Sequence, residues 1–108
     1  MGIYNKLIRD RIPKIIFASG KQAVIRVMDD KEYRKEIRKK LYEELEEYLR
    51  AEDDDAALEE LADMLELIHV LTEIHGSTPG ELEMIRAGKA EKRGGFKEKL
   101  FLERVMDE

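Results

Sequence analysis

The stretch "LEELADMLELIHVL", residues 58–71, has the composition of a buried helix, yet two acids interrupt its apolar run. A helix turns about 100° per residue, so the leucines, isoleucine and valine of this stretch spread over most of its circumference. A single polar stripe remains, formed by glutamates spaced by seven: Glu59, Glu66 and Glu73. Glu60 and Asp63 fall outside that stripe, next to apolar residues. We therefore expect a central or interface helix that carries two carboxylates on a packed face.

The segment before it also carries acids beside an apolar stripe. That stripe, at helical spacing, consists of Tyr33, Ile37, Leu41, Leu45 and Tyr48. Glu44 falls within the stripe and Glu47 just past its edge, whereas Glu43 points toward solvent. Two neighbouring helices are thus each predicted to present an acid pair at i, i+3 on or beside the packed face.

Start and stop signals for helices divide the chain into about four helices within one domain, residues 1–108. Pro13 and Gly20 bound a short first helix, and Asp29 followed by Glu32 is typical of a capping box. The expected helices run over about 13–19, 29–51, 56–75 and 78–93. The predicted fold class is all-α, an antiparallel helical bundle, because a short turn joins the two long helices.

Two short segments are predicted to be extended rather than helical. Residues 23–28, "AVIRVM", alternate and contain β-branched side chains, which favours a strand. Residues 99–105 are the candidate partner of that strand, so a short β pair accompanies the predicted bundle.

Composition excludes several classes of function. Charged residues make up 42% of the 108 residues, but the net charge is −5 and both signs are mixed, which argues against nucleic-acid binding. The chain contains no cysteine, so disulfides, thiolate metal sites and cysteine nucleophiles are excluded. No apolar run is long enough for a signal peptide or a membrane span, so we expect a cytoplasmic protein without a membrane partner.

Carboxylates that converge in a partly dry site need neutralisation. Salt bridges to nearby basic residues are one solution, and Arg38, Lys39 and Lys40 are close in sequence. Hard cations are the other, since Mg²⁺ and Mn²⁺ prefer oxygen ligands. The pattern leaves both solutions open. Neither His69 nor His75 has the spacing of a di-iron carboxylate site.

Four sequence elements resemble one known family. "EELEE" at 43–47 reads E-E-x-x-E, and "ELAD" at 60–63 reads E-x-x-D on the next helix. In that order they resemble the signature of the MazG-type all-α nucleoside triphosphate pyrophosphohydrolases. "YNKLIRDRIP" at 4–13 and "KAEKRGGF" at 89–96 resemble a small branch predicted to cleanse nucleotide pools. The resemblance covers essentially the whole chain, although the gap between the acidic motifs is at the short end of the family range.

The resemblance implies an enzyme that cleaves a nucleoside triphosphate between its α- and β-phosphates and works as a homodimer or homotetramer. The implied ligands of Mg²⁺, or Mn²⁺, are Glu44, Glu47, Glu60 and Asp63. Glu43 matches the first motif position in a supporting role, and one of these five acids would take the proton of the attacking water. The implied substrate contacts are Asn5, Lys6, Arg9, Lys89 and Arg93.

Two other functions compete with this interpretation. A phosphoribosyl-ATP pyrophosphohydrolase has similar acidic motifs, but "YNKLIRD" at 4–10 argues against it. A non-catalytic helical interaction module would instead pair its acids with lysines and arginines. Such a module has no need for Glu60 and Asp63 on an apolar arc.

Overall fold

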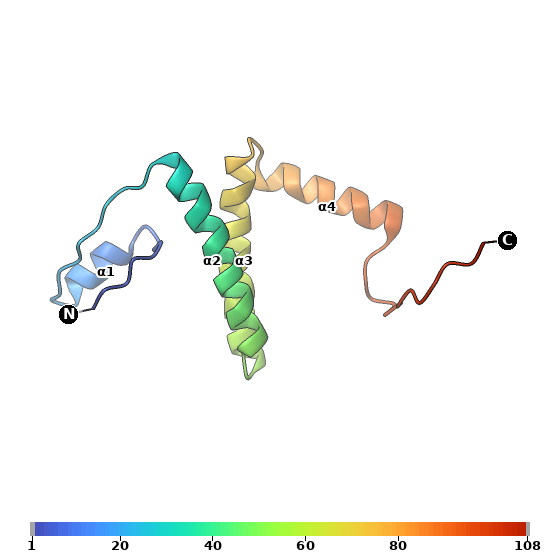
Figure 1. The fold of residues 1–108 in the computed structure, drawn as a ribbon, viewed down its shortest axis with the longest axis horizontal. Coiled ribbons are helices and arrows are strands. Elements are labelled where there is room, and N and C mark those ends of the chain that lie inside the picture. Colours follow the sequence, from blue (N-terminus) through green and yellow to red (C-terminus); the bar gives the residue numbers. More distant parts are fainter. Residues whose placement is uncertain (1, 108) are drawn as a thin grey trace.

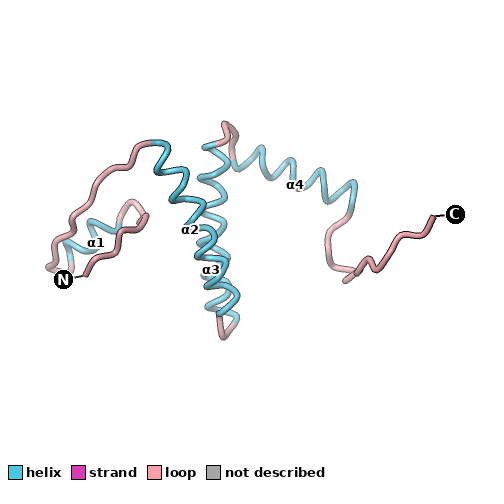
Figure 2. The backbone as a smooth tube through the Cα atoms, viewed as in Figure 1, coloured by secondary structure: helices cyan, strands magenta, loops and turns pink. Residues whose placement is uncertain are grey.

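Residues 2–107 are described by a computed structural model in which every regular element is a helix (Figure 1, Figure 2). The helices are α1 (Ile12–Ala18), α2 (Asp30–Arg50), α3 (Asp54–Ile74) and α4 (Pro79–Arg93). Helices α2 and α3 lie side by side and run antiparallel, joined by residues 51–53 (Figure 1). The predicted all-α class with four helices is confirmed for the part of the chain that is described.

Side-chain caps fix where the three longer helices begin. Asp29, Asp53 and Thr78 each accept a hydrogen bond from the backbone N–H three residues later, at 2.8, 2.8 and 3.1 Å. Each bond satisfies an N–H that has no partner within the helix. The starts of α2 and α4 agree with the sequence prediction. Helix α3 begins at Asp54, earlier than the expected residue 56, because Asp53 is its cap.

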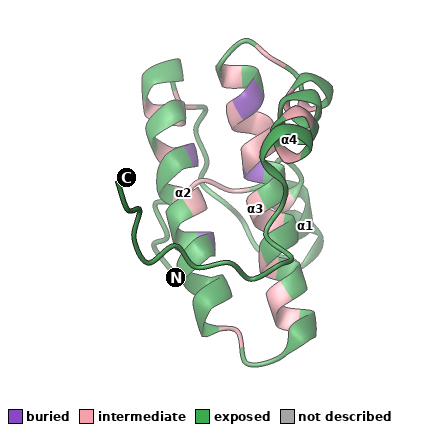
Figure 3. Cartoon of the chain, turned by 90° about the vertical axis from the view of Figure 1, so that its right-hand side faces the viewer, coloured by how far each residue is buried: buried purple, intermediate pink, exposed green. Residues whose placement is uncertain are grey.

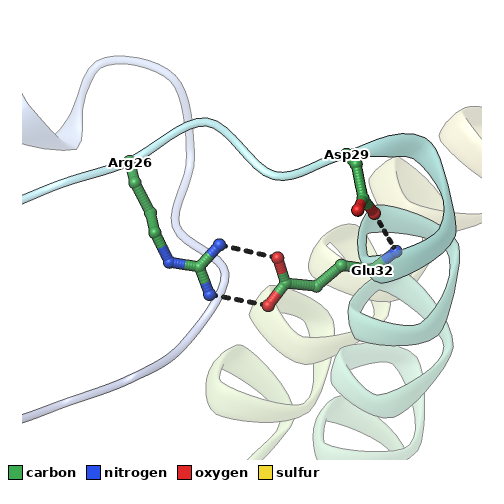
Figure 4. Close-up of polar contacts among 3 residues, drawn as sticks. All are labelled: Arg26, Asp29 and Glu32. Atoms are coloured by element: carbon green, nitrogen blue, oxygen red, sulfur yellow. Dashed lines mark hydrogen bonds and ion pairs between the residues drawn. The ribbon is translucent and has the colours of Figure 1, made fainter.

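Arg26 ties the first turn of α2 to the extended segment before it (Figure 4). Two nitrogens of its guanidinium donate to the two carboxylate oxygens of Glu32, each at 2.6 Å. These hydrogen bonds lower the pKa of Glu32. The capping box predicted here is half formed, because Asp29 caps the helix while the Glu32 carboxylate turns to Arg26.

The hydrophobic core lies between α2 and α3 (Figure 3). Ile37 and Leu67 are its buried apolar side chains, with exposed fractions of 2% and 8%. Glu44 follows Ile37 by seven residues on α2, and Leu67 follows Glu60 by seven on α3. Since the helices are antiparallel and seven residues make about two turns, the register that brings Glu44 to Glu60 also brings Ile37 level with Leu67.

The chain is elongated. Its radius of gyration is 18.9 Å, whereas a compact domain of this length has about 13 Å. Helices α2 and α3 together form a helical hairpin. The segment containing α1 lies at one end of the molecule, and α4 touches α3 and then extends away from this hairpin at the other end (Figure 1). Apolar side chains are therefore exposed along much of the chain.

The predicted strand pair is absent from residues 2–107. Segments 23–28 and 99–105 lie at opposite ends of the molecule, so neither gives the other the ladder of hydrogen bonds that a strand needs (Figure 2). Lys99 also has a φ of +61°, and its N–H donates to the carbonyl of Phe96 at 3.3 Å. That turn interrupts the extended backbone at the point where the second strand was expected to begin.

Candidate metal centre

Three of the four predicted metal ligands converge between α2 and α3. Glu44, Glu47 and Glu60 each offer a carboxylate oxygen, and these oxygens lie within 4.8 Å of one another. Glu44 and Glu47 share one face of α2 because they are three residues apart, and Glu60 faces them from α3. We call these three residues the acidic cluster.

Glu44 is buried although it carries a carboxylate. Its exposed fraction is 7%, close to that of the core residue Leu67. One oxygen of Glu44 and one oxygen of Glu60, Oε2 in both, are buried and have no hydrogen-bond partner among residues 2–107. A buried carboxylate oxygen without a donor is costly. A proton on Glu44, or a cation held between Glu44 and Glu60, would remove that cost.

The surroundings of Glu44 favour its protonated form when no cation is present. They raise the pKa of Glu44 to about 8. Burial is the largest cause, followed by the interaction with the Glu60 carboxyl and by the negative charges of Glu47 and Asp63. The same charges that hold a proton on Glu44 would favour a divalent cation in its place.

Lysine neutralises only part of the acidic cluster. Lys40 Nζ lies 3.9 Å from Glu44 Oε1, longer than a direct hydrogen bond of about 2.7–3.2 Å. In the described chain, no lysine or arginine forms an ion pair with Glu47 or Glu60. Lys40 is one of the three basic residues that the sequence offered for neutralising these acids, and its i, i+4 spacing brings it near Glu44.

Asp63, the fourth predicted ligand, has a different partner. Arg9 Nη2 donates to Asp63 Oδ1 at 2.6 Å, across 54 positions of sequence. Asp63 is three residues beyond Glu60 on α3, so it lies beside the acidic cluster without joining the three converging oxygens. The structure thus joins a predicted metal ligand to a predicted substrate contact. Glu43 is exposed on α2 and lies outside the cluster.

The other predicted substrate contacts are dispersed. Asn5 and Lys6 are exposed near the N-terminus, and Lys6 Nζ lies 5.4 Å from the ring centroid of Tyr4. Lys89 and Arg93 are exposed on α4, which extends away from the hairpin (Figure 1). Within one copy, the structure does not bring these α4 cations to the acidic cluster.

Two hollows lie on α4 and its junctions. One of about 140 Å³ is lined by Arg93, Gly94, Gly95 and Phe96 together with residues 98–100. The other, of about 300 Å³ and almost entirely apolar, lies between α3 and α4 and includes Leu71, Leu82 and Ile85. No pattern in the sequence predicts the second hollow, because its shape depends on the angle between two helices.

Comparison with known proteins provides one relative. A 54-residue stretch is 50% identical to an uncharacterised protein of Mycolicibacterium smegmatis, and it covers 50% of this chain and 55% of that protein. The match thus spans about half the length of the relative. No family model matches the chain. No solved structure matches it either. Among the described residues, no helix combines the length and the apolar character that crossing a bilayer requires.

Proposed function

We propose that this chain is a Mg²⁺-dependent nucleoside triphosphate pyrophosphohydrolase that releases a monophosphate and pyrophosphate, with removal of aberrant nucleotides as its role. The observation that carries the proposal is the acidic cluster, in which Glu44 and Glu60 each bury an oxygen that has no donor. Carboxylates that project inward from facing helices are how some helical bundles hold metal ions. The resemblance of both acidic motifs to the MazG-type enzymes supports the same activity.

The residues of the site have separate roles in this proposal. Glu44, Glu47 and Glu60 would hold Mg²⁺, or Mn²⁺ in its place, since both ions prefer oxygen ligands. When bound, the ion would offset the charge that develops on the phosphoryl oxygens. Arg9 has the planar donor geometry that suits phosphate oxygens. Glu43 keeps a supporting role outside the cluster.

The active form is proposed to be a homodimer or homotetramer. Leu58, Leu61 and Leu65 form an exposed stripe on α3, with exposed fractions of 62%, 44% and 52%. An apolar stripe of this kind on a central helix is typical of an interface between chains. Together with the radius of gyration of 18.9 Å, it favours a second copy that covers the hairpin. Lys89 and Arg93 of one copy would then reach phosphates bound by the other.

A helical interaction module without catalytic activity is the second candidate. The ion pairs Arg9–Asp63 and Lys40–Glu44 favour it, because they neutralise acids without a metal. It predicts that the protein responds weakly to Mg²⁺. The phosphoribosyl-ATP pyrophosphohydrolase alternative shares the chemistry of the first candidate and differs in substrate alone.

Pyrophosphate release from a panel of normal and modified nucleoside triphosphates, with Mg²⁺ present, tests the proposal. We expect release from at least one triphosphate, and its loss in Glu60→Gln, which removes a charge and keeps the shape. Glu59→Gln is the matched control, because Glu59 is the exposed neighbour of Glu60 on α3. A folded protein that releases pyrophosphate from none of the panel would overturn the activity, and full turnover in Glu60→Gln would overturn the site.

A further inference from the structure

Arg9 connects the N-terminal segment to α3 through a single ion pair. Its guanidinium nitrogen and the Asp63 carboxylate oxygen are 2.6 Å apart. Both side chains retain contact with solvent, with exposed fractions of 59% and 38%. An exposed ion pair of this kind contributes little stability, so another ligand of either partner can displace it at small cost.

Asp63 is close enough to the acidic cluster to influence its charge. It lies three residues after Glu60 on α3, and its negative charge is one of the causes that raise the pKa of Glu44. While Arg9 holds its carboxylate, Asp63 has one oxygen engaged and a positive charge beside it. Both effects weaken its attraction for a cation.

We propose that Arg9 exchanges Asp63 for a phosphate oxygen, and that this exchange makes the binding of phosphate and of Mg²⁺ cooperative. The inference rests on the proposed function, because it assumes a cation at the acidic cluster. A guanidinium pairs with phosphate as well as with carboxylate, so an arriving anion competes directly for Arg9. Asp63 is then freed to turn toward the cation. By linkage, the cation strengthens phosphate binding by the same factor.

The exchange is tested by titrating the full chain with Mg²⁺, with and without inorganic phosphate as the anion. Calorimetry and thermal melting measure the binding of Mg²⁺. In the wild-type chain we expect phosphate to raise the affinity for Mg²⁺ about fivefold or more, the lower range of coupling between sites. In Arg9→Gln, Mg²⁺ alone should bind more tightly than in the wild-type chain, and phosphate should change that affinity less than twofold.

Arg11→Gln is the matched control, since it removes the same charge two residues away at an exposed position without an ion pair in the described chain. It should keep the wild-type response to phosphate. A phosphate effect that persists in Arg9→Gln, or that is lost equally in Arg11→Gln, would overturn the exchange. If the wild-type chain binds Mg²⁺ and Glu60→Gln does not, the assignment of the metal centre stands even when the exchange is overturned. If the wild-type chain binds no Mg²⁺, the exchange and the proposed function fail together.

Discussion

Glu44 of α2 and Glu60 of α3 place carboxylate oxygens within 4.8 Å of each other, and each also buries an oxygen that has no donor in the described chain. Two like charges at this distance between α2 and α3 repel each other, because burial removes much of the water that would screen them. The hairpin therefore pays for this arrangement in stability unless a proton or a cation is bound.

Magnesium is expected to stabilise the folded chain. A ligand that binds the native state alone adds about 2.7 kcal/mol to the free energy of unfolding at a hundredfold excess over its Kd. Thermal melting with increasing Mg²⁺ measures this gain. Glu44→Gln should lose the response, because the amide is a weaker ligand than the carboxylate. Glu46→Gln, at an exposed position of the same helix, should keep it. An equal response in both variants would falsify the assignment of the cluster.

Without a divalent cation, stability is expected to fall as the pH rises. The folded state holds the pKa of Glu44 at about 8, above its ordinary value of 4.5, so folding favours the protonated form. The contribution of that proton is fully present below pH 4.5 and is lost as the pH rises toward about 8. Melting temperatures in the presence of a chelator, compared between the wild-type chain and Glu44→Gln, isolate this group. The melting temperature of Glu44→Gln should rise further above that of the wild-type chain as the pH rises. A constant difference in melting temperature would contradict the mechanism.

Ile37 is expected to contribute strongly to the stability of the hairpin. It is 2% exposed, and truncation of a buried isoleucine to alanine costs about 2–5 kcal/mol. Urea unfolding of Ile37→Ala, followed by circular dichroism, measures the loss. Ile15→Ala removes the same atoms from a side chain that is 60% exposed, and it should change stability by less than about 1 kcal/mol. Equal losses would show that the core lies elsewhere.

The exposed stripe on α3 is expected to hold copies of the chain together. Leu61→Glu places a charge at the centre of that stripe and should weaken self-association by about 2 kcal/mol or more, roughly thirtyfold in Kd. Sedimentation over a range of protein concentrations measures the change. Glu66→Lys alters the charge on the polar face of the same helix and should leave the association intact. A wild-type chain that remains monomeric at high concentration would contradict the proposed assembly.

Local signals in the sequence were sufficient for the helices and for most of the acidic cluster. Asp29 and Thr78 mark helix starts because a cap depends only on residues within one turn. The helical period likewise places Glu44 and Glu60 on packed faces. No local signal predicts the pairing of Arg9 with Asp63, because it joins segments 54 positions apart through tertiary structure. The turn at Lys99 was also missed, since a positive φ at lysine has no signature in the sequence.

The spacing of seven residues from Ile37 to Glu44, and from Glu60 to Leu67, ties the chemistry of the hairpin to its packing. An inserted residue between Ile37 and Glu44 would rotate the Glu44 carboxylate by about 100°, out of the interface between α2 and α3, while Ile37 stayed level with Leu67. Homologous chains should therefore accept insertions and deletions in the 51–53 connection far more readily than inside either seven-residue interval. A relative in which either seven-residue spacing is altered should still fold, but it should have lost the proposed metal centre.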